Sequence, residues 1–186
     1  LSPARAFLDL AFPRIEISIP KQGSRAILCV PGAHAKRMHE RFSIAKDARN
    51  ILTSHSIAVP SIVNVLGYRA MSPAEVGSFV SQHQQSYDGT FNEKDFWPAQ
   101  YRFIQQELQL PGDLIHTLRS GIFTNLYKHS DTPSRSTTFD NAAAVAKWVQ
   151  QALKKGFLSE NDSIIFCIEQ PFSHRMFLIF KTMLQR

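Results

Sequence analysis

The sequence predicts an α/β fold, a three-layer α/β/α sandwich around a mainly parallel, Rossmann-like sheet. The first observation is a pair of continuous apolar runs at 25–30 and 61–66, which are typical of strands buried on both faces. The second is an apolar stripe with helical spacing over 35–54, between the two runs. A strand, a helix and a strand in this order favour a βαβ unit with two parallel strands. Because strands and helices go on alternating toward the C-terminus, three layers are expected.

The chain length of 186 residues, of which 44% are apolar, favours one domain. We expect that domain to span 25–186. Residues 1–24 precede it, and 15–19 alternate apolar and polar between Pro13 and Pro20. This pattern predicts an edge strand or an N-terminal arm over the domain.

The later elements follow from caps, apolar spacing and turn residues. Ser72 is a good N-cap because Pro73 fits the first helical turn and Glu75 lies near the positive helix end. Gly156 is expected to end a later helix. The expected elements are helices over 72–83 and 96–108, a strand over 122–127, a helix from 138 to about 155, a strand over 163–168 and a helix over 172–184.

The role of residues 84–97 stays open at this point. The segment combines a polar stretch with an Asp88-Gly89 turn, so it is typical of a mobile flap or an insertion. Its aromatic side chains either cover a ligand or pack on the core. They are Tyr87, Phe91, Phe96 and Trp97.

Charge and cysteine usage limit the partners and the compartment. The formal net charge of +6 favours anionic partners. The basic residues are scattered without an aromatic-lined stripe, so a solvated basic surface is the simpler interpretation, and nucleic acid is the least favoured partner. Cys29 and Cys167 lie in apolar runs, which predicts buried thiols in a reducing compartment and hence a cytoplasmic location. No apolar run is long enough to span a bilayer, although the start at Leu1 leaves a trimmed N-terminal anchor open.

Two polar loops near the C-terminus are expected at the carboxyl edge of the sheet, where parallel α/β proteins bind ligands. The first places three hydroxyls at a helix amino end, which attracts anions through free N–H groups and the helix dipole. Capping alone accounts for one hydroxyl and for Asp140, and the two interpretations remain open. The candidate binding residues of this loop are Ser136, Thr137, Thr138 and Asn141.

The second loop follows the strand at 163–168. Arg175 suits a phosphate or a carboxylate, and Gln170 suits an amide or a base edge. His174 and Asp140 are the candidate catalytic residues, since both can exchange protons, with surface or capping roles as the alternative. Across the cleft, the turns after the first two strands add Gly32, His34, Arg37 and Gly67 as candidate binding residues.

The sequence lacks the motifs of several common metal, catalytic and nucleotide-binding sites. His34 and His39 are five residues apart, which does not place both on one helical face, and no Cys pair or HExxH motif occurs, so no metal site is expected. There is no Gly-x-Ser-x-Gly nucleophile elbow, no complete Gly-x-Gly-x-x-Gly motif and no Walker loop.

With these residues in view, the chain resembles the YdcF, SanA and ElyC family of bacterial domains. Residues 138–142, Thr-Phe-Asp-Asn-Ala, resemble the family's Thr-x-Glu-Asn-Ala signature, and 167–175 resemble its later strand, polar loop and Arg. Gly32 with Arg37 is similar to the family's first glycine loop. Each of the first two loops has one glycine where the family usually has more, with Tyr68 in the second.

The resemblance implies a Rossmann-like sheet with a pocket at its carboxyl edge and a small anionic or nucleotide-like ligand. A nucleotide or S-adenosylmethionine, which has been proposed for the YdcF branch, is the candidate cofactor. Hydrolase or transferase activity is the catalytic form of this hypothesis. The alternative is a non-enzymatic envelope or regulatory factor on the same scaffold, because both glycine loops are reduced. For the SanA and ElyC branches the resemblance implies envelope-related roles.

Overall fold

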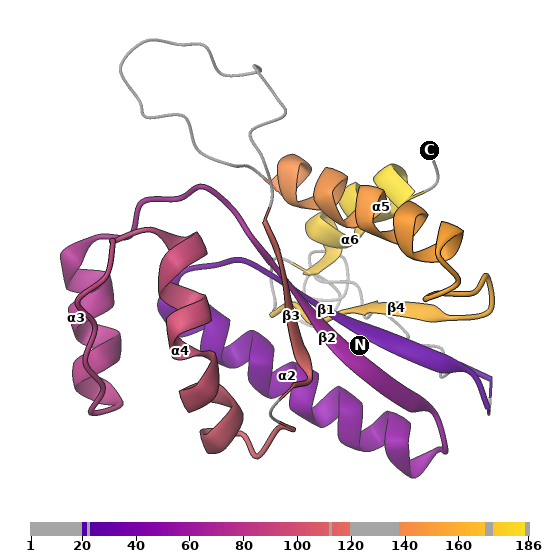
Figure 1. Ribbon diagram of the computed structural model, residues 1–186, viewed down its shortest axis with the longest axis horizontal. Helices are drawn as coiled ribbons and strands as arrows, with labels where there is room; N and C mark the ends of the chain where they lie inside the picture. The colour runs from indigo at the N-terminus through magenta and orange to yellow at the C-terminus, as the bar shows by residue number, and fades with distance from the viewer. Residues whose placement is uncertain (1–19, 22, 112, 120–137, 170–172, 185–186) are drawn as a thin grey trace, which may run out of the picture.

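The computed structural model describes residues 20–21, 23–111, 113–119, 138–169 and 173–184, without the side chains of 173–177 and 183. Within these residues helices and strands alternate along the chain, as expected, except that two helices follow each other between residues 73 and 107 (Figure 1). In chain order the elements are β1 (Arg25–Pro31), α2 (Ala35–Ser54), β2 (Ala58–Leu66), α3 (Pro73–Gln82), α4 (Glu93–Glu107), β3 (Ile115–Arg119), α5 (Thr138–Lys154), β4 (Ser163–Phe166) and α6 (Ser173–Leu184).

The described strands form one four-stranded parallel sheet in the order β3-β2-β1-β4. β1 lies in the middle, in register with β2 through Val30 opposite Asn64 and with β4 through Leu28 opposite Ile165. The chain therefore proceeds outward from β1 to β2 and β3, and then continues to β4 on the other side of β1. Such a reversal of strand order marks the crevice in which doubly wound sheets bind ligands.

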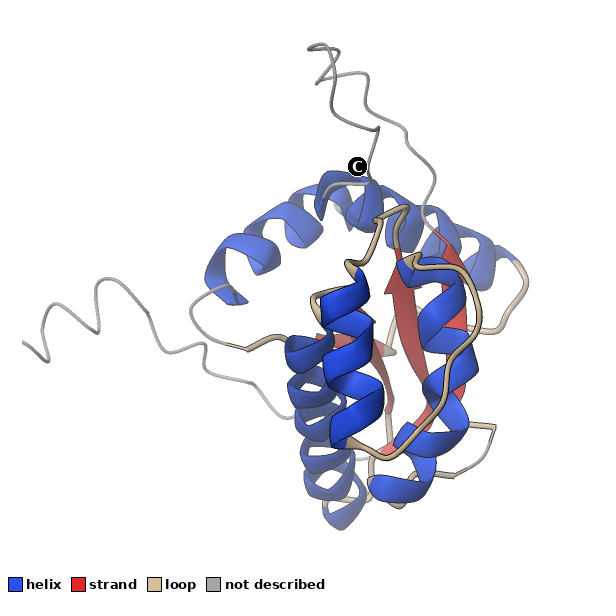
Figure 2. Cartoon of the chain, turned by 90° about the vertical axis from the view of Figure 1, so that its left-hand side faces the viewer, coloured by secondary structure: helices blue, strands red, loops and turns tan. Residues whose placement is uncertain are grey.

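Helices cover both faces of the sheet, so the predicted three-layer α/β architecture is confirmed (Figure 2). The side chains of β1 alternate between the two helical layers, because successive side chains of a strand point to opposite faces of the sheet. Ala26, Leu28 and Val30 belong to the core cluster that includes side chains of α2, α3 and α4. Ile27 and Cys29 belong to the second cluster, with side chains of α5 and α6.

The predicted boundaries of most elements agree with the structure to within a few residues. The helix predicted over 35–54 is α2. In α3, Ser72 is the N-cap, and its Oγ accepts a hydrogen bond of 3.0 Å from the N–H of Glu75. The helix predicted to begin at residue 96 begins earlier, at Glu93, because Asn92 provides the cap: its Oδ1 accepts a hydrogen bond from the N–H of Lys94.

The third strand lies elsewhere than predicted. β3 runs over Ile115–Arg119 and pairs with β2, whereas the predicted run at 122–127 falls outside the described residues. β3 was missed because its residues mix polar with apolar types, as an edge strand with half-exposed side chains allows. The strand or arm predicted over 15–19 also lies outside the described residues.

Residues 84–97 contribute to the core. Phe96 and Trp97 are fully buried, and Tyr87 packs against Phe96 with ring centroids 4.9 Å apart. Phe91 is about half exposed, at 47%. The interpretation that these aromatic residues pack on the core is therefore correct for Phe96 and Trp97.

The opposite, amino edge of the sheet is closed by an ion pair. Arg25 Nη2 lies 2.6 Å from Asp162 Oδ2 and also donates to the carbonyl of Phe157 at 3.0 Å. Because Arg25 begins β1 and Asp162 immediately precedes β4, this pair joins neighbouring strands at their start. Among the described helices, none combines the length and the apolar character that crossing a membrane would need.

Candidate functional site

The turns that follow β1 and β2 meet at the carboxyl edge of the sheet. β1 ends at Pro31, and the N–H of Gly32 donates to the carbonyl of Val65 at 2.7 Å, which holds the first turn against β2. β2 ends at Leu66 and is followed by Gly67. A cavity of about 220 Å³ opens between these turns. Its lining residues are Gly32, Ala33, His34, Gly67, Arg69, Glu93, Thr138 and Asn141.

Gly32 has no room for a side chain. A Cβ atom at this position would lie 1.9 Å from Glu93 Oε1 and 3.0 Å from the carbonyl oxygen of Val65. The Glu93 carboxylate therefore packs directly on the main chain of the first turn. Glycine is required here for this close approach and not for an unusual backbone angle.

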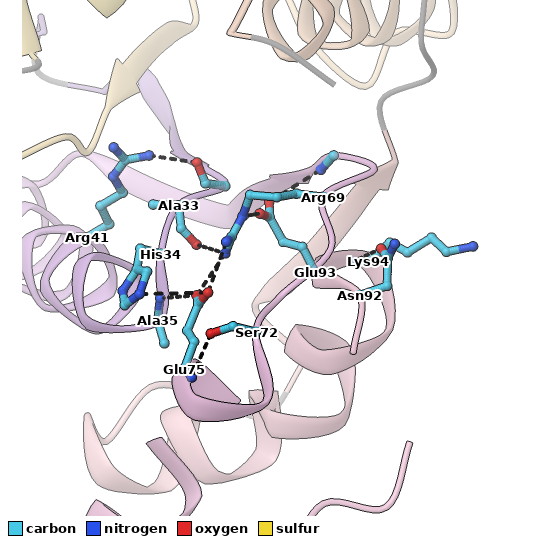
Figure 3. A network of polar contacts seen from close by, with 12 residues as sticks. Ala33, His34, Ala35, Arg41, Arg69, Ser72, Glu75, Asn92, Glu93 and Lys94 are labelled. Carbon is cyan, nitrogen blue, oxygen red and sulfur yellow. Dashed lines mark hydrogen bonds and ion pairs between the residues drawn. The ribbon is translucent and has the colours of Figure 1, made fainter. Parts of the chain in front are cut away.

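Arg69 lies between two buried carboxylates (Figure 3). Its Nε is 2.7 Å from Glu93 Oε2, and its two Nη atoms are 3.0 and 2.9 Å from the oxygens of Glu75. The Nη2 atom also donates to the carbonyl of Ala33 at 3.2 Å. One side chain that follows β2 therefore joins the first turn to the beginnings of α3 and α4.

Glu75 is positioned at the amino end of α2. Its Oε1 accepts the N–H of Ala35 at 2.9 Å, and its Oε2 lies 3.7 Å from His34 Nε2. His34, the N-cap of α2, makes no side-chain capping hydrogen bond. A carboxylate from a different helix thus accepts the hydrogen bond that a capping residue usually accepts.

Glu93 is positioned by a short pairing of the chain with itself. Ala70 and Asn92 form an antiparallel bridge, and the N–H of Glu93 donates to the carbonyl of Arg69 at 3.0 Å. The Glu93 residue is 3% exposed, although its side chain lines the cavity. Its Oε1 lies 3.4 Å from the N–H of Gly67, a long hydrogen bond.

The two carboxylates differ in proton affinity. Burial raises the pKa of Glu93 above its ordinary value and the charge of Glu75 adds to the rise, which Arg69 only partly offsets. Burial acts in the same direction on Glu75, but hydrogen bonds from Arg69 and Ala35 and the charge of Arg69 hold its pKa below the ordinary value. Burial alone would lower the pKa of Arg69, whereas both carboxylates raise it, so the guanidinium stays charged. Pairs of groups with pKa values pushed apart suit proton exchange, with Glu93 as the group that takes up the proton.

A second arginine, Arg41, is buried and holds the outer side of the first turn. Arg41 of α2 donates from Nη1 to the carbonyls of Pro31 and Gly32 at 2.7 and 3.1 Å. Its Nε and Nη2 reach both oxygens of Glu169, which follows β4, at 2.5 and 3.1 Å. This bidentate pair connects the turn after β1 with the segment after β4 on either side of the strand-order reversal.

The structure brings together five of the residues predicted from the sequence to bind a ligand. Gly32, His34, Gly67, Thr138 and Asn141 all line the cavity.

The remaining candidate residues lie elsewhere. Arg37 is not among the lining residues, and its Nε lies 3.7 Å from Glu169 Oε1. Asp140 is fully buried in the first turn of α5 and does not line the cavity. The backbone of His174 and Arg175 lies in the first turn of α6, whereas their side chains, together with all of Ser136, Thr137 and Gln170, are outside the described structure.

Sequence reasoning missed Arg69 and Glu93 as site residues and assigned Glu75 only a favourable place in a helix. No motif marks them, because they meet through the packing of α3 and α4 against the first turn. The available signal was weak: a glutamate beside an N-cap Asn, in the first turn of a helix that carries Phe96 and Trp97. In the part of the chain that the structure describes, no group of three His, Cys, Asp or Glu side chains has the geometry of a metal site.

Compared with known proteins, the chain matches no protein-family model, no curated protein sequence and no solved structure. The resemblance to the YdcF, SanA and ElyC family therefore stays a prediction from the sequence. The structure itself shows a parallel sheet within an α/β fold and a polar cavity at the carboxyl edge of that sheet.

Proposed function

We propose that this chain binds a small nucleotide-like ligand, with S-adenosylmethionine among the candidates, in the cavity at the carboxyl edge of β1 and β2. The observation that carries the proposal is the cavity itself, which combines two glycine turns, a helix amino end and a buried glutamate. Its volume of about 220 Å³ is below the range of roughly 300–1,000 Å³ that is usual for pockets of drug-sized ligands. It therefore suits a sugar with its immediate neighbours and not a whole dinucleotide.

The lining offers two kinds of chemistry. At the beginning of α5, the Thr138 hydroxyl and the helix dipole favour an anionic group. On the other side, Glu93 favours a group that donates hydrogen bonds. A nucleotide-like ligand carries both kinds of group. A hydrolase or transferase that uses Glu93 to exchange a proton is the catalytic form of this proposal, and a cytoplasmic location remains part of it because Cys29 and Cys167 are buried free thiols.

Isothermal titration with nucleosides, nucleotides, S-adenosylmethionine and S-adenosylhomocysteine tests the proposal. We expect at least one compound to bind with a Kd below about 1 mM. The Asn141→Ala variant should weaken that binding about tenfold, since it removes a lining amide. Asn50→Ala, the same change at an exposed position of α2, is the control and should leave it unchanged. If no compound binds more tightly than about 1 mM, the proposal is wrong.

A non-enzymatic regulatory or envelope-related factor is the second candidate. It is favoured by the occupied main-chain donors: Glu75 accepts from Ala35 and Glu93 from Gly67, at positions where a phosphate-transferring enzyme would hold its substrate. Assays of phosphoester hydrolysis and of methyl transfer distinguish the two. Turnover that disappears in Asn141→Ala would reject this candidate, and ligand binding without turnover would favour it.

A further inference from the structure

The main-chain donors after β1 and β2 already have anionic partners from within the chain. In dinucleotide-binding sheets, the first glycine turn and the following helix amino end hold phosphate groups. Here the N–H of Ala35, at the beginning of α2, donates to Glu75 at 2.9 Å. The N–H of Gly67 points toward Glu93 Oε1 at 3.4 Å. Glu75 thus takes the place of a bound phosphate at the first turn, and Glu93 accepts from the main-chain donor of the second turn.

The space beside the first turn is filled as well. Glu93 Oε1 lies 1.9 Å from the position of a hypothetical Cβ on Gly32. A phosphate that approached the main chain at Gly32 would therefore collide with a carboxylate oxygen. The close approach that glycine permits is used by Glu93 and not by a ligand.

The local charge acts in the same direction. One guanidinium, Arg69, faces two carboxylates, Glu75 and Glu93, so the three groups carry one net negative charge when both carboxylates are ionised. Among the ion pairs of the described residues, His34 contacts only one of the two carboxylates: its Nε2 lies 3.7 Å from Glu75 Oε2. An incoming phosphate would meet repulsion at these turns, whereas a hydroxyl or ammonium group would not.

Glu93 can accept further hydrogen bonds. A carboxylate has about four acceptor positions, and the described residues supply Glu93 with Arg69 Nε at 2.7 Å and the distant N–H of Gly67. Because its side chain lines the cavity while the residue is 3% exposed, a ligand donor would be bound with little competition from water. Hydrogen bonds to charged groups are the stronger ones under such conditions.

We propose that Glu93 determines the ligand specificity of this cavity: it selects a ligand group that donates hydrogen bonds, such as vicinal hydroxyls or an ammonium group, and keeps phosphate away from the turns after β1 and β2. This inference rests on the proposed function, the binding of a nucleotide-like ligand. It adds the orientation of that ligand in the cavity. The hydroxyl-bearing part lies against Glu93, and any phosphate lies toward α5 or outside the cavity.

Titration of adenosine, 2′,3′-dideoxyadenosine and AMP, with inorganic phosphate as competitor, tests the orientation. On the wild type, removing both hydroxyls should weaken binding at least about tenfold, because a hydrogen bond to a charged group is lost. AMP should bind no more than about tenfold more tightly than adenosine, and about 10 mM phosphate should not displace adenosine. In Glu93→Gln the penalty for removing the hydroxyls should fall to about threefold or less.

The control is Asp95→Asn, the same charge change in the first turn of the same helix but outside the cavity lining. It should bind all three compounds as the wild type does. If Glu93→Gln does not fold, the three wild-type measurements still decide between the outcomes. Equal binding of adenosine and its dideoxy form, or displacement of adenosine by phosphate, overturns the inference and leaves the proposed function intact. If neither adenosine nor AMP binds, the nucleotide-like ligand is wrong and the inference falls with it.

Discussion

The guanidinium of Arg69 contacts two carboxylates whose pKa values are shifted in opposite directions. Glu75 has a lowered pKa because hydrogen bonds from Arg69 and Ala35 and the charge of Arg69 outweigh its burial. Glu93 has a raised pKa because its burial dominates over the contact with Arg69. Deeper burial and fewer hydrogen bonds thus distinguish Glu93, which lines the cavity, from Glu75.

Replacing Glu75 with Gln should lower stability in a pH-dependent way. Since the pKa of Glu75 in the folded protein is below its ordinary value of 4.5, the ionised side chain stabilises the fold above that pH, and this contribution is lost as the pH falls through the folded-state pKa. Urea unfolding between pH 7 and 3 should show a stability difference from the wild type that is constant above about pH 5.5 and shrinks below pH 4.5. Glu40→Gln, at an exposed position of α2, is the control. A difference that grows on acidification would contradict this account.

Gly32→Ala should destabilise the protein by about 1–3 kcal/mol, the usual cost of forcing extra volume into a packed position. The new methyl group would collide with Glu93 Oε1, which must leave Arg69 or shift the turn. Gly77→Ala is the matched control. It lies in α3, nothing is within 4 Å of its hypothetical Cβ, and the change should stabilise the helix by about 0.5–1 kcal/mol. Denaturant unfolding of both variants measures this, and destabilisation of the same size in both would refute the steric explanation.

At the scale of elements, α2 does more than cover the sheet. Its buried Arg41 reaches the carbonyls of the turn after β1 and both oxygens of Glu169 after β4. One side chain therefore sets the relative position of two loops that leave neighbouring strands. The shape of the carboxyl edge depends on this contact as much as on the strands themselves.

Arg41→Met should cost about 3 kcal/mol or more in free energy of unfolding, because it leaves Glu169 without its buried partner. Arg37→Met is the control on the same helix. Its side chain is 46% exposed and 3.7 Å from the same carboxylate, and exposed pairs contribute about 0–1 kcal/mol. Thermal and urea unfolding of the two variants compare them directly. Equal losses would mean that the burial of Arg41 has no special energetic weight.

Elements with strong local signals were predictable, and those with weak signals were not. The apolar runs of β1 and β2 were clear, because both strands are buried along most of their length. The stripe of α2 was clear because Met38, Phe42 and Ala45 recur at helical spacing and face the core. β3 was missed, since His116 and Arg119 are exposed and interrupt its apolar pattern. α4 begins three residues before its predicted start, because 93–95 are charged and show no apolar periodicity.

The candidate site was predictable only for residues whose position follows from the topology of a parallel sheet. Gly32, Gly67 and Thr138 were identified because parallel strands end at one edge and helices begin there. Arg69 and Glu93 were not, because their meeting depends on how α3 and α4 pack. Spacing along the chain does not encode that packing.

At the scale of the whole molecule, the sheet separates two core clusters, and each cysteine belongs to a different one: Cys167 to the cluster on the α2 side and Cys29 to the cluster on the α5 side. Both thiols are buried, and the N–H of Cys167 donates to the carbonyl of Cys29 at 2.8 Å. Burial raises the pKa of Cys167 to about 12, and it raises that of Cys29 as well. Their reactivity therefore depends on opening of the whole sheet.

Thiol labelling with a chromogenic disulfide at pH 8 should be at least about a thousandfold slower in native buffer than in urea, because native reaction requires global unfolding. In urea both cysteines should react completely, which serves as the control for reagent access. A stabilising ligand should slow the native reaction further. Rapid labelling of either thiol in native buffer would show that one core cluster opens independently of the other.

The amino and carboxyl ends of the strands are far enough apart that a label can be attached at one end without reaching the other. Arg25 and Asp162 hold the amino ends of β1 and β4 together, and the seven residues of β1 place roughly 20 Å between that pair and Gly32 at a strand rise of about 3.3 Å per residue. A fluorophore or a surface tether attached at the exposed position of Glu160 would consequently lie near the Arg25–Asp162 ion pair and far from the cavity. Immobilised in that orientation, the protein would hold the carboxyl edge of its sheet away from the surface.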